Sequence, residues 1–152
     1  MTISIQPVST SEQLNLCYQM QTAIFHHELN LLGMQIPDNY DRLSLYVQII
    51  DSKVVVGTYR IVPNTSLGLP IEETGFNFNQ IDQNKVCEMS RLVLVKENWG
   101  KIPFSKVFSF ARKVAKEHYN ASTLVVAILS QFVSIEAVWF LKGGRSTIWS
   151  NC

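Results

Sequence analysis

A glutamate and an arginine lie three residues apart in the stretch "VCEMSRLVLV", which spans residues 86–95 and is otherwise mostly apolar. Burying an unpaired charge is costly, so Glu88 and Arg91 need each other, other partners or a cleft. In a regular strand, side chains three positions apart point to opposite faces. A β-bulge near Met89 or Ser90 would turn both charges toward one cleft. The alternative is a partly buried ion pair that holds the sheet in register.

The same stretch can also supply hydrogen-bond donors. A bulge leaves backbone N–H groups unpaired, and such groups can polarise a carbonyl oxygen. The following loop, "NWGKIP" at residues 98–103, comes directly before a predicted helix. Its N–H groups and the positive end of the helix dipole favour a phosphate group. Strand, bulge, glycine loop and helix together predict a site for a thioester cofactor.

The first elements of the chain must position these groups. "ISIQPV" predicts a short strand, and Ser9 with Glu12 forms an S-x-x-E capping box for a helix that runs to about Leu31 and is closed by Gly33. An inward stripe of this helix combines apolar residues with two polar ones. The polar pair is either a helix edge that reaches solvent or the lining of a cleft. The stripe consists of Leu14, Cys17, Gln21, Ile24, Phe25 and Glu28.

Residues 42–62 predict a β-hairpin. Apolar and polar residues alternate in "RLSLYVQII", and the turn "DSK" leads into "VVVGTYRIV". Arg60 shares a face with Val54, Val56 and Thr58, whereas a charge facing solvent would have polar neighbours. The segment from residue 63 to residue 84 is a long connection with an apolar "GFNF". Long loops in compact domains tend to be functional or mobile.

The second half predicts a strand, helix, strand unit. Pro103 suits the first turn of an amphipathic helix in "FSKVFSFARKVAKEHY", and "TLVVAIL" has the continuous apolar pattern of a parallel strand. Ser134 would then begin a shorter helix, "SIEAVWFLKGG", which Gly143 and Gly144 end, and "RSTIWS" predicts an edge strand. The expected fold class is α/β, with a mixed sheet that is mostly antiparallel first and parallel later, and with flanking helices.

Length, charge and cysteine content narrow the class further. With 152 residues and 47% hydrophobic composition, the chain is expected to form a single domain, 1–152. A formal net charge of +1 without a basic run argues against nucleic acid as a partner. Cys17, Cys87 and Cys152 lack metal-ligand spacing, which predicts free thiols and no metal site. Because the sequence shows no signal-peptide or membrane-span pattern, we expect a cytoplasmic location.

The motifs follow one another in an order that is typical of one family. "DNYD" at 38–41, "VVVGTYRIVP" at 54–63, "LP", "GFNF" and "CEMSRLVL" at 87–94 resemble the acyl-homoserine-lactone (autoinducer) synthases and the related N-acyl amino acid synthases. Those proteins have the Gcn5-related N-acyltransferase fold, and the similarity spans about residues 21–102. The resemblance implies transfer of an acyl group from acyl carrier protein or coenzyme A to the amine of an amino acid or a similar small acceptor.

The resemblance also implies roles for particular residues. Glu88 and Arg91 look like the catalytic E-x-x-R pair, in which the glutamate is a candidate base or orienting group. Gln21 stands where those enzymes often have an arginine, four residues before Phe25. The acceptor-binding residues are then Asp38, Asp41, Arg60, Gln21, Phe25 and Phe76.

The donor site implied by the resemblance follows Glu88 in the chain. The phosphate motif of the fold, Q/R-x-x-G-x-G/A, is matched in "ENWGKI" only at Gly100, so a long-chain acyl group on acyl carrier protein is expected rather than coenzyme A. Strand amides near Leu92 would stabilise the oxyanion. The donor-binding residues are Leu92, Val93, Trp99, Gly100, Lys101 and Ile102. Cations that could steer an acidic partner, or simply form a solvated helix face, are Lys96, Lys101, Lys106, Arg112 and Lys113.

Other interpretations stay open. An acetyl-coenzyme A-dependent N-acetyltransferase and a catalytically degraded acyl- or partner-binding module would share the fold. Direct transfer needs no covalent intermediate, and apolar neighbours should keep the Cys87 thiol inert. Trp99 is expected to pack rather than to stack on a substrate. The chain stops soon after "RSTIWS", so the sheet is expected to be shortened or completed by another subunit, as in a homodimer.

Overall fold

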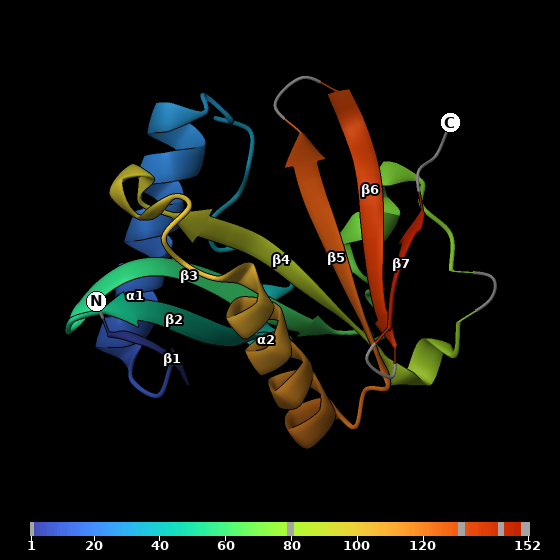
Figure 1. The fold of residues 1–152 in the computed structure, drawn as a ribbon. Coiled ribbons are helices and arrows are strands. Elements are labelled where there is room, and N and C mark those ends of the chain that lie inside the picture. The colour runs from blue at the N-terminus through green and yellow to red at the C-terminus, as the bar shows by residue number, and fades with distance from the viewer. Residues whose placement is uncertain (1, 79–80, 131–132, 143–144, 150–152) are drawn as a thin grey trace. The chain divides into compact units, whose positions relative to one another are not determined.

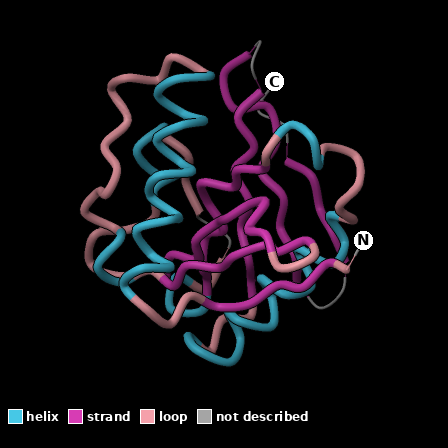
Figure 2. The backbone as a smooth tube through the Cα atoms, turned by 90° about the vertical axis from the view of Figure 1, so that its left-hand side faces the viewer, coloured by secondary structure: helices cyan, strands magenta, loops and turns pink. Residues whose placement is uncertain are grey.

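A computed structural model describes the backbone of residues 2–78, 81–130, 133–142 and 145–149, and the surroundings of side chains up to Val126. The chain divides into two compact units, which are described separately. Unit 1 comprises Met1–Arg60 and Arg91–Val107, and unit 2 comprises Ile61–Ser90 and Phe108–Cys152. Figure 1 labels the elements along the chain, and Figure 2 distinguishes helices, strands and loops on the same backbone.

In unit 1 the strands begin with the expected hairpin. β1 (Ile3–Pro7) pairs antiparallel with β2 (Leu45–Asp51), and β3 (Val54–Pro63) follows β2. The turn residues Ser52 and Lys53 have φ angles of +50° and +76°. Positive φ at both central residues is the backbone of a type I′ turn, whose twist matches that of the flanking strands. The sequence therefore places the hairpin correctly.

The N-cap of helix α1 (Ser11–Gln21) lies one residue later than the predicted N-cap, Ser9. Thr10 is the N-cap: its Oγ1 accepts the N–H of Gln13 at 3.2 Å, and Oε1 of Gln13 accepts the N–H of Thr10 at 3.2 Å. Gln13 also accepts the N–H of Ser9 at 2.8 Å. The predicted Ser9–Glu12 box is therefore wrong, because the glutamine rather than the glutamate reaches back to the cap.

The predicted single helix is also wrong beyond Gln21. The chain continues as a π-helix, η1 (Thr22–Glu28), which follows α1 in Figure 1. The N–H of Leu29 donates to the carbonyl of Ile24 at 2.9 Å, which is the i→i+5 bond of a π-helix. This wider spacing shifts the helical phase after Gln21. Consequently Gln21 and Phe25 are buried as expected, whereas Glu28 is exposed.

α1 covers one face of β2. The rings of Tyr18 and Tyr46 meet edge to face, with their centroids 5.5 Å apart. Nε2 of Gln48 donates to the carbonyl of Gln13 at 3.3 Å. Tyr46 and Gln48 are therefore buried like their neighbour Val47, so β2 is covered on both faces despite its alternating sequence.

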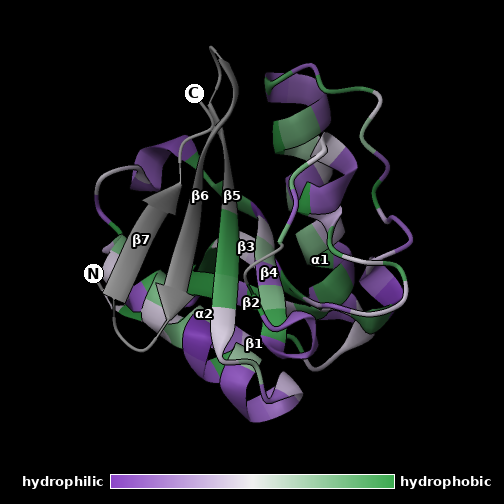
Figure 3. Cartoon of the chain, turned by 90° about the vertical axis from the view of Figure 1, so that its right-hand side faces the viewer, coloured by the Kyte–Doolittle hydropathy of each residue, from purple (hydrophilic) through white to green (hydrophobic). Residues whose placement is uncertain are grey.

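The second half of the chain contains the expected strand, helix, strand unit. β4 (Val86–Leu94) pairs in parallel with β5 (Thr123–Ser130), from Val86 opposite Thr123 to Met89 opposite Val126. Between them runs α2 (Phe104–Tyr119), which begins directly after Pro103. The described residues of β5 are mostly apolar, as the green ribbon in Figure 3 shows. The βαβ prediction is confirmed.

The end of the sheet differs from the prediction. Residues of the predicted helix "SIEAVWFLKGG" form a strand, β6 (Val133–Lys142), which pairs antiparallel with β5, and β7 (Arg145–Trp149) pairs antiparallel with β6. Valine, isoleucine, tryptophan and phenylalanine favour a pleated surface, and pairing with β5 outweighs the helical spacing. The later part of the sheet is therefore mostly antiparallel rather than parallel, while β7 confirms the predicted last strand.

The connections carry short 3-10 turns. η2 (Asp41–Leu43) and η5 (Lys96–Asn98) lie in unit 1, and η3 (Pro70–Thr74) and η4 (Gln83–Lys85) lie in the long connection of unit 2. Across the residues described, no helix has the length and apolar character that a membrane span requires.

Candidate functional site

The centre of the candidate site is Arg60, whose side chain is 1% exposed on β3 in unit 1. Its guanidinium holds Asp38 with two bonds, from Nη1 to Oδ1 at 2.6 Å and from Nη2 to Oδ2 at 2.9 Å. Nη1 also donates to Oδ1 of Asp41 at 2.9 Å. The ring of Tyr40 lies 5.8 Å from the guanidinium carbon. The inward direction predicted for Arg60 is confirmed, and the acidic pair surrounds it.

The loop before β2 shapes this acidic pair. The N–H of Asp38 donates to Oδ2 of Asp41 at 2.6 Å, and the N–H of Tyr40 donates to Oδ1 of Asp38 at 2.9 Å. The hydroxyl of Tyr46 on β2 donates to Oδ1 of Asp41 at 2.5 Å. The two aspartates are thus turn residues and ion-pair partners at once. The sequence did not indicate Tyr46, because a tyrosine in an alternating strand gives no sign of a polar partner.

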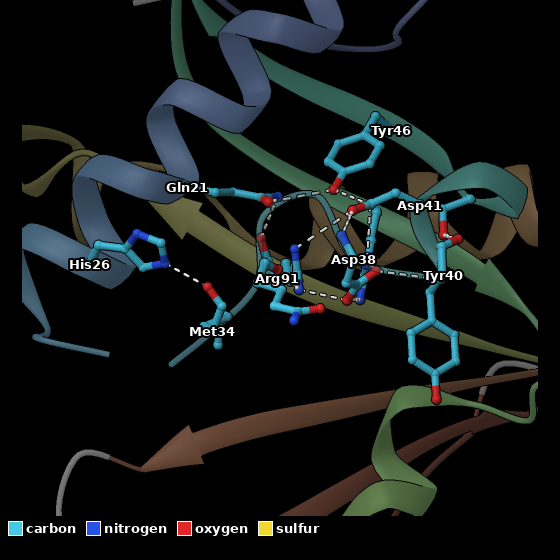
Figure 4. A network of polar contacts seen from close by, with 11 residues as sticks. Gln21, His26, Met34, Asp38, Tyr40, Asp41, Tyr46 and Arg91 are labelled. Atoms are coloured by element: carbon cyan, nitrogen blue, oxygen red, sulfur yellow. Dashed lines mark hydrogen bonds and ion pairs between the residues drawn. The ribbon is translucent and has the colours of Figure 1, made fainter. Parts of the chain in front are cut away.

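Arg91 on β4 reaches the same acidic pair. Its Nη2 donates to Oδ2 of Asp38 and to the carbonyl of Gln35, both at 2.6 Å, and its Nη1 lies 3.8 Å from Oδ2 of Asp41. Its φ angle is +56°, in the left-handed region that few residues other than glycine adopt. The backbone of β4 is therefore irregular at Arg91, and the β-bulge near Met89 or Ser90 stays a prediction. Figure 4 shows Arg91 beside Asp38 and Asp41.

Gln21 links the end of α1 to this network. Its side chain is fully buried, its Oε1 lies 3.4 Å from the hydroxyl oxygen of Tyr46, and its Nε2 donates to the carbonyl of Arg91 at 3.5 Å. Phe25, one turn later, is buried at 5% exposure. Both residues thus line the interior, as predicted, and Gln21 holds the backbone of Arg91.

The electrostatics of the network follow from its pairing. Burial raises the pKa of Asp38, but the hydrogen bond and charge of Arg60 and the charge of Arg91 outweigh burial and lower it overall. Burial lowers the pKa of Arg60, while its hydrogen bond to Asp38 and the charges of both aspartates raise it overall. Burial and the bond to Asp41 raise the pKa of Tyr46. At neutral pH the network therefore contains a charged Arg60, an ionised Asp38 and a neutral Tyr46.

Glu88 belongs to unit 2 and is 1% exposed. Its Oε2 accepts the N–H of Ile71, at the start of η3, at 2.8 Å. The long connection of this unit therefore has a defined role, since it brings a backbone donor to the buried carboxylate. No sequence pattern indicates Ile71, because this residue contributes its backbone N–H, which every residue except proline has. Phe76 is half-buried, and its ring lies edge to face with Phe78 at 4.9 Å between centroids.

The predicted donor residues after Arg91 all lie in unit 1. Val93 and Ile102 are buried and Leu92 is half-buried, whereas Gly100 and Lys101 are exposed. Gly100 has a φ angle of +74°, which favours glycine at this turn. The role of these residues in binding a donor stays a prediction.

Trp99 differs from its predicted packing role. Its side chain is 58% exposed, and its indole Nε1 donates to the carbonyl of Leu94 at 3.0 Å. Lys96, three residues earlier, forms an exposed ion pair with Glu28 at 3.2 Å. The prediction that Trp99 packs is wrong, because the short η5 turn ties the indole to the end of β4 and leaves the ring in solvent.

Cys17, Cys87 and His26 have ordinary structural surroundings. Cys17 and Cys87 are buried free thiols, and burial raises the pKa of Cys87 to about 12. A thiol with such a pKa is a poor nucleophile, as predicted. Nε2 of His26 lies 2.6 Å from the carbonyl oxygen of Met34. Within the described ranges, no group of three or more histidine, cysteine, aspartate or glutamate side chains could hold a metal ion.

Comparison with known proteins identifies the family. Residues 22–107, more than half of the chain, match the family model described as acetyltransferase (GNAT) domain. The chain belongs to this family. GNAT enzymes take an acyl group from an acyl-coenzyme A thioester and pass it to a small amine. No curated protein matches the chain.

Solved structures with the GNAT fold are similar to this chain at low identity. A GNAT acetyltransferase from Staphylococcus aureus Mu50 has a TM-score of 0.59 and 13% identity, over 86% of this chain and 76% of that one. FeeM, an N-acyl amino acid synthase from uncultured soil microbes, has a TM-score of 0.58 and 13% identity, over 84% and 73%. Escherichia coli ElaA has a TM-score of 0.61 and 14% identity, over 85% and 80%. At these identities the similarity confirms the mixed α/β fold with flanking helices.

Proposed function

We propose that this GNAT protein transfers an acyl group from a thioester donor to the amine of an amino acid or a similar small acceptor. The observation that carries the proposal is the buried network of Asp38, Asp41, Arg60 and Arg91 in unit 1. Buried ion pairs are weak sources of stability, so the chain gains little folding energy from placing four charges here. Such clusters are common at sites that hold polar substrates. The network is therefore assigned to recognition of the acceptor.

The chemistry would be direct transfer. The amine acceptor loses a proton to Glu88, alone or through a water molecule, and attacks the thioester carbonyl. Backbone N–H groups near Leu92 stabilise the oxyanion, and the thiol of the donor leaves. Support for the base role comes from the burial of Glu88 and from its bond to the N–H of Ile71, which orients the carboxylate. The Cys87 thiol takes no part, because its raised pKa keeps it protonated.

The donor is proposed to be a long-chain acyl group on acyl carrier protein. Lys101 and Lys106 are exposed and flank the start of α2, where they could attract an acidic partner. The loop "ENWGKI" retains only Gly100 of the phosphate motif, which weakens the case for coenzyme A. FeeM, which has a similar fold, is an N-acyl amino acid synthase, and this supports an amino acid as the acceptor.

Two further candidates have their own support. The family description names an acetyltransferase, which favours acetyl-coenzyme A as donor and a short acyl group. A degraded acyl- or partner-binding module is favoured by Gln21, which replaces the arginine of the related enzymes, and by the incomplete phosphate motif. The intact charged network argues against that module.

Mass spectrometry of lipid extracts tests the proposal directly. Cells that express the protein should contain an N-acyl species that is missing from cells that express Glu88→Gln, at equal amounts of folded protein. The mass of the new species identifies both the acyl chain and the amine. A short N-acetyl product would favour acetyl transfer. Identical extracts, together with no turnover of acyl carrier protein or coenzyme A thioesters by the purified protein, would refute an enzymatic role.

A further inference from the structure

One nitrogen of the charged network lacks a hydrogen bond. Nη1 of Arg91 is shielded from solvent and has no hydrogen-bond partner among the described residues. It forms an ion pair with Oδ2 of Asp41, but the 3.8 Å between the two atoms is too long for a hydrogen bond. Buried polar groups are normally paired, so an unpaired guanidinium nitrogen needs an explanation.

Arg91 cannot easily turn to find a partner. A guanidinium is planar, and Nη2 is already fixed by Asp38 and by the carbonyl of Gln35. The carbonyl of Arg91 is held by Nε2 of Gln21. Oδ2 of Asp41 is held in turn by the N–H of Asp38 at 2.6 Å. The orientation of Nη1 is therefore set by the surrounding groups, at a residue with a left-handed backbone, and strain of this kind is concentrated at functional sites.

The carbonyl of Gln35, which accepts from Arg91, belongs to an irregular segment, residues 33–37, here called the covering segment. It lies outside the helices and strands, and Gly33, Gln35 and Pro37 are exposed. One end is held by His26 through the carbonyl of Met34, as Figure 4 shows. The carbonyl of Gln35 accepts from Arg91, and the N–H of Met34 donates to the carbonyl of Leu31 at 3.1 Å. Few bonds hold this segment, so its displacement is inexpensive compared with opening a strand or helix.

We infer that the acceptor carries a carboxylate, which replaces the carbonyl of Gln35 and binds Nη1 and Nη2 of Arg91 together. This inference rests on the proposed function and specifies its acceptor. A carboxylate matches the fork of a guanidinium with two parallel bonds, whereas one peptide carbonyl satisfies only one side. The bond between Gln35 and Arg91 thus marks the place of one ligand oxygen, and the unpaired Nη1 marks the place of the other. Displacement of the covering segment exposes both nitrogens.

Matched pairs of ligands test this inference by binding as well as by turnover. Each proteinogenic L-amino acid is compared with its own carboxamide, because the two differ mainly in the charge of the carboxyl group. Calorimetry with the purified protein gives the affinity, and the same pairs serve as acceptors with long-chain acyl thioesters. Arg91→Lys keeps a cation for Asp38 but lacks a second donor nitrogen in a fork. Arg42→Gln, at an exposed arginine, is the matched control.

We expect at least one amino acid to bind about 10-fold or more tightly than its amide, because the amide cannot form the bidentate charged pair with Arg91. In Arg91→Lys this preference should fall to near unity, and in Arg42→Gln it should persist. Backbone amides of residues 33–36 should exchange hydrogen faster when the amino acid is bound. Equal affinity for acid and amide, binding of neither, or an unchanged preference in Arg91→Lys would overturn the inference. Acylation of amides as efficiently as acids would overturn it while leaving the proposed function intact, whereas binding without acylation of any amine would refute the proposed function alone.

Discussion

Replacing Asp38 by asparagine removes the carboxylate that joins two arginines. Asp38 accepts from Arg60 through both oxygens and from Arg91 through Oδ2, so Asp38→Asn leaves two guanidinium groups with one negative charge fewer. Breaking a buried ion pair from one side costs about 3–5 kcal/mol. The side chain is 16% exposed and the amide oxygen can still accept, so we expect a loss of about 2–4 kcal/mol. For a chain of this length that loss corresponds to a decrease in Tm of about 4–16 °C.

The pH dependence of this loss follows from the lowered pKa of Asp38. A carboxylate whose folded pKa is depressed contributes stability above its unfolded pKa of about 3.9, and this contribution is lost as the pH falls through the folded pKa. The difference in unfolding free energy between the parent and Asp38→Asn should thus be constant from pH 8 to about pH 5 and shrink below about pH 4. Acid should destabilise the parent more than the variant.

Urea unfolding at a series of pH values measures both effects. Asp82→Asn is the matched control, because Asp82 is an exposed helix cap whose side chain accepts from the N–H of Asn84, and asparagine caps equally well. The control should stay within about 0.5 kcal/mol of the parent at every pH. If Asp38→Asn cost less than about 1 kcal/mol, or if its cost were the same at pH 7 and pH 3, the network would not be held by Asp38 as an ionised bridge.

Three other substitutions probe separate parts of the molecule. Glu88→Gln should abolish acyl transfer while the fold persists, and turnover within about threefold of the parent, less than roughly 1 kcal/mol of barrier, would exclude a base role. Gly57→Ala should lower the free energy of unfolding by about 1–3 kcal/mol, since a Cβ would lie 2.7 Å from the carbonyl oxygen of Val93; equal stability in urea would show that the strands can separate there. Reversal of Lys101 and Lys106 to glutamate should slow association with acyl carrier protein strongly at low salt and weakly at high salt, and unchanged kinetics, or efficient turnover of short-chain coenzyme A thioesters alone, would contradict the carrier-protein donor.

The sequence predicted the elements that follow from local pattern. Alternation and a short polar turn identified the β2–β3 hairpin, and the apolar neighbours of Arg60 indicated that it points inward. The continuous apolar run of β5 indicated a parallel strand. These features depend on side-chain periodicity, which is written directly in the order of the residues.

The errors arise where long-range contacts decide. Residues 134–144 have helical spacing, but those of β6 pair with β5, and no residue within the segment signals that partner. The phase of the π-helix moved Glu28 into solvent, because an i→i+5 bond has no sequence signature. The partners of the candidate site were likewise invisible when they were backbone groups, such as the carbonyl of Gln35 and the N–H of Ile71.

Gln21 stands where the enzymes that the sequence resembles often have an arginine, and its side chain contacts two neighbouring groups. Nε2 of Gln21 donates to the carbonyl of Arg91, and its Oε1 lies 3.4 Å from the hydroxyl oxygen of Tyr46, whose single proton is directed to Asp41. A third arginine beside Arg60 and Arg91 would also add a positive charge to a cluster in which two aspartates already balance two arginines. The neutral amide therefore keeps the charges balanced and holds the left-handed backbone of Arg91. For the proposed carboxylate acceptor, the guanidinium donors would come from Arg91 on β4 rather than from position 21 on α1.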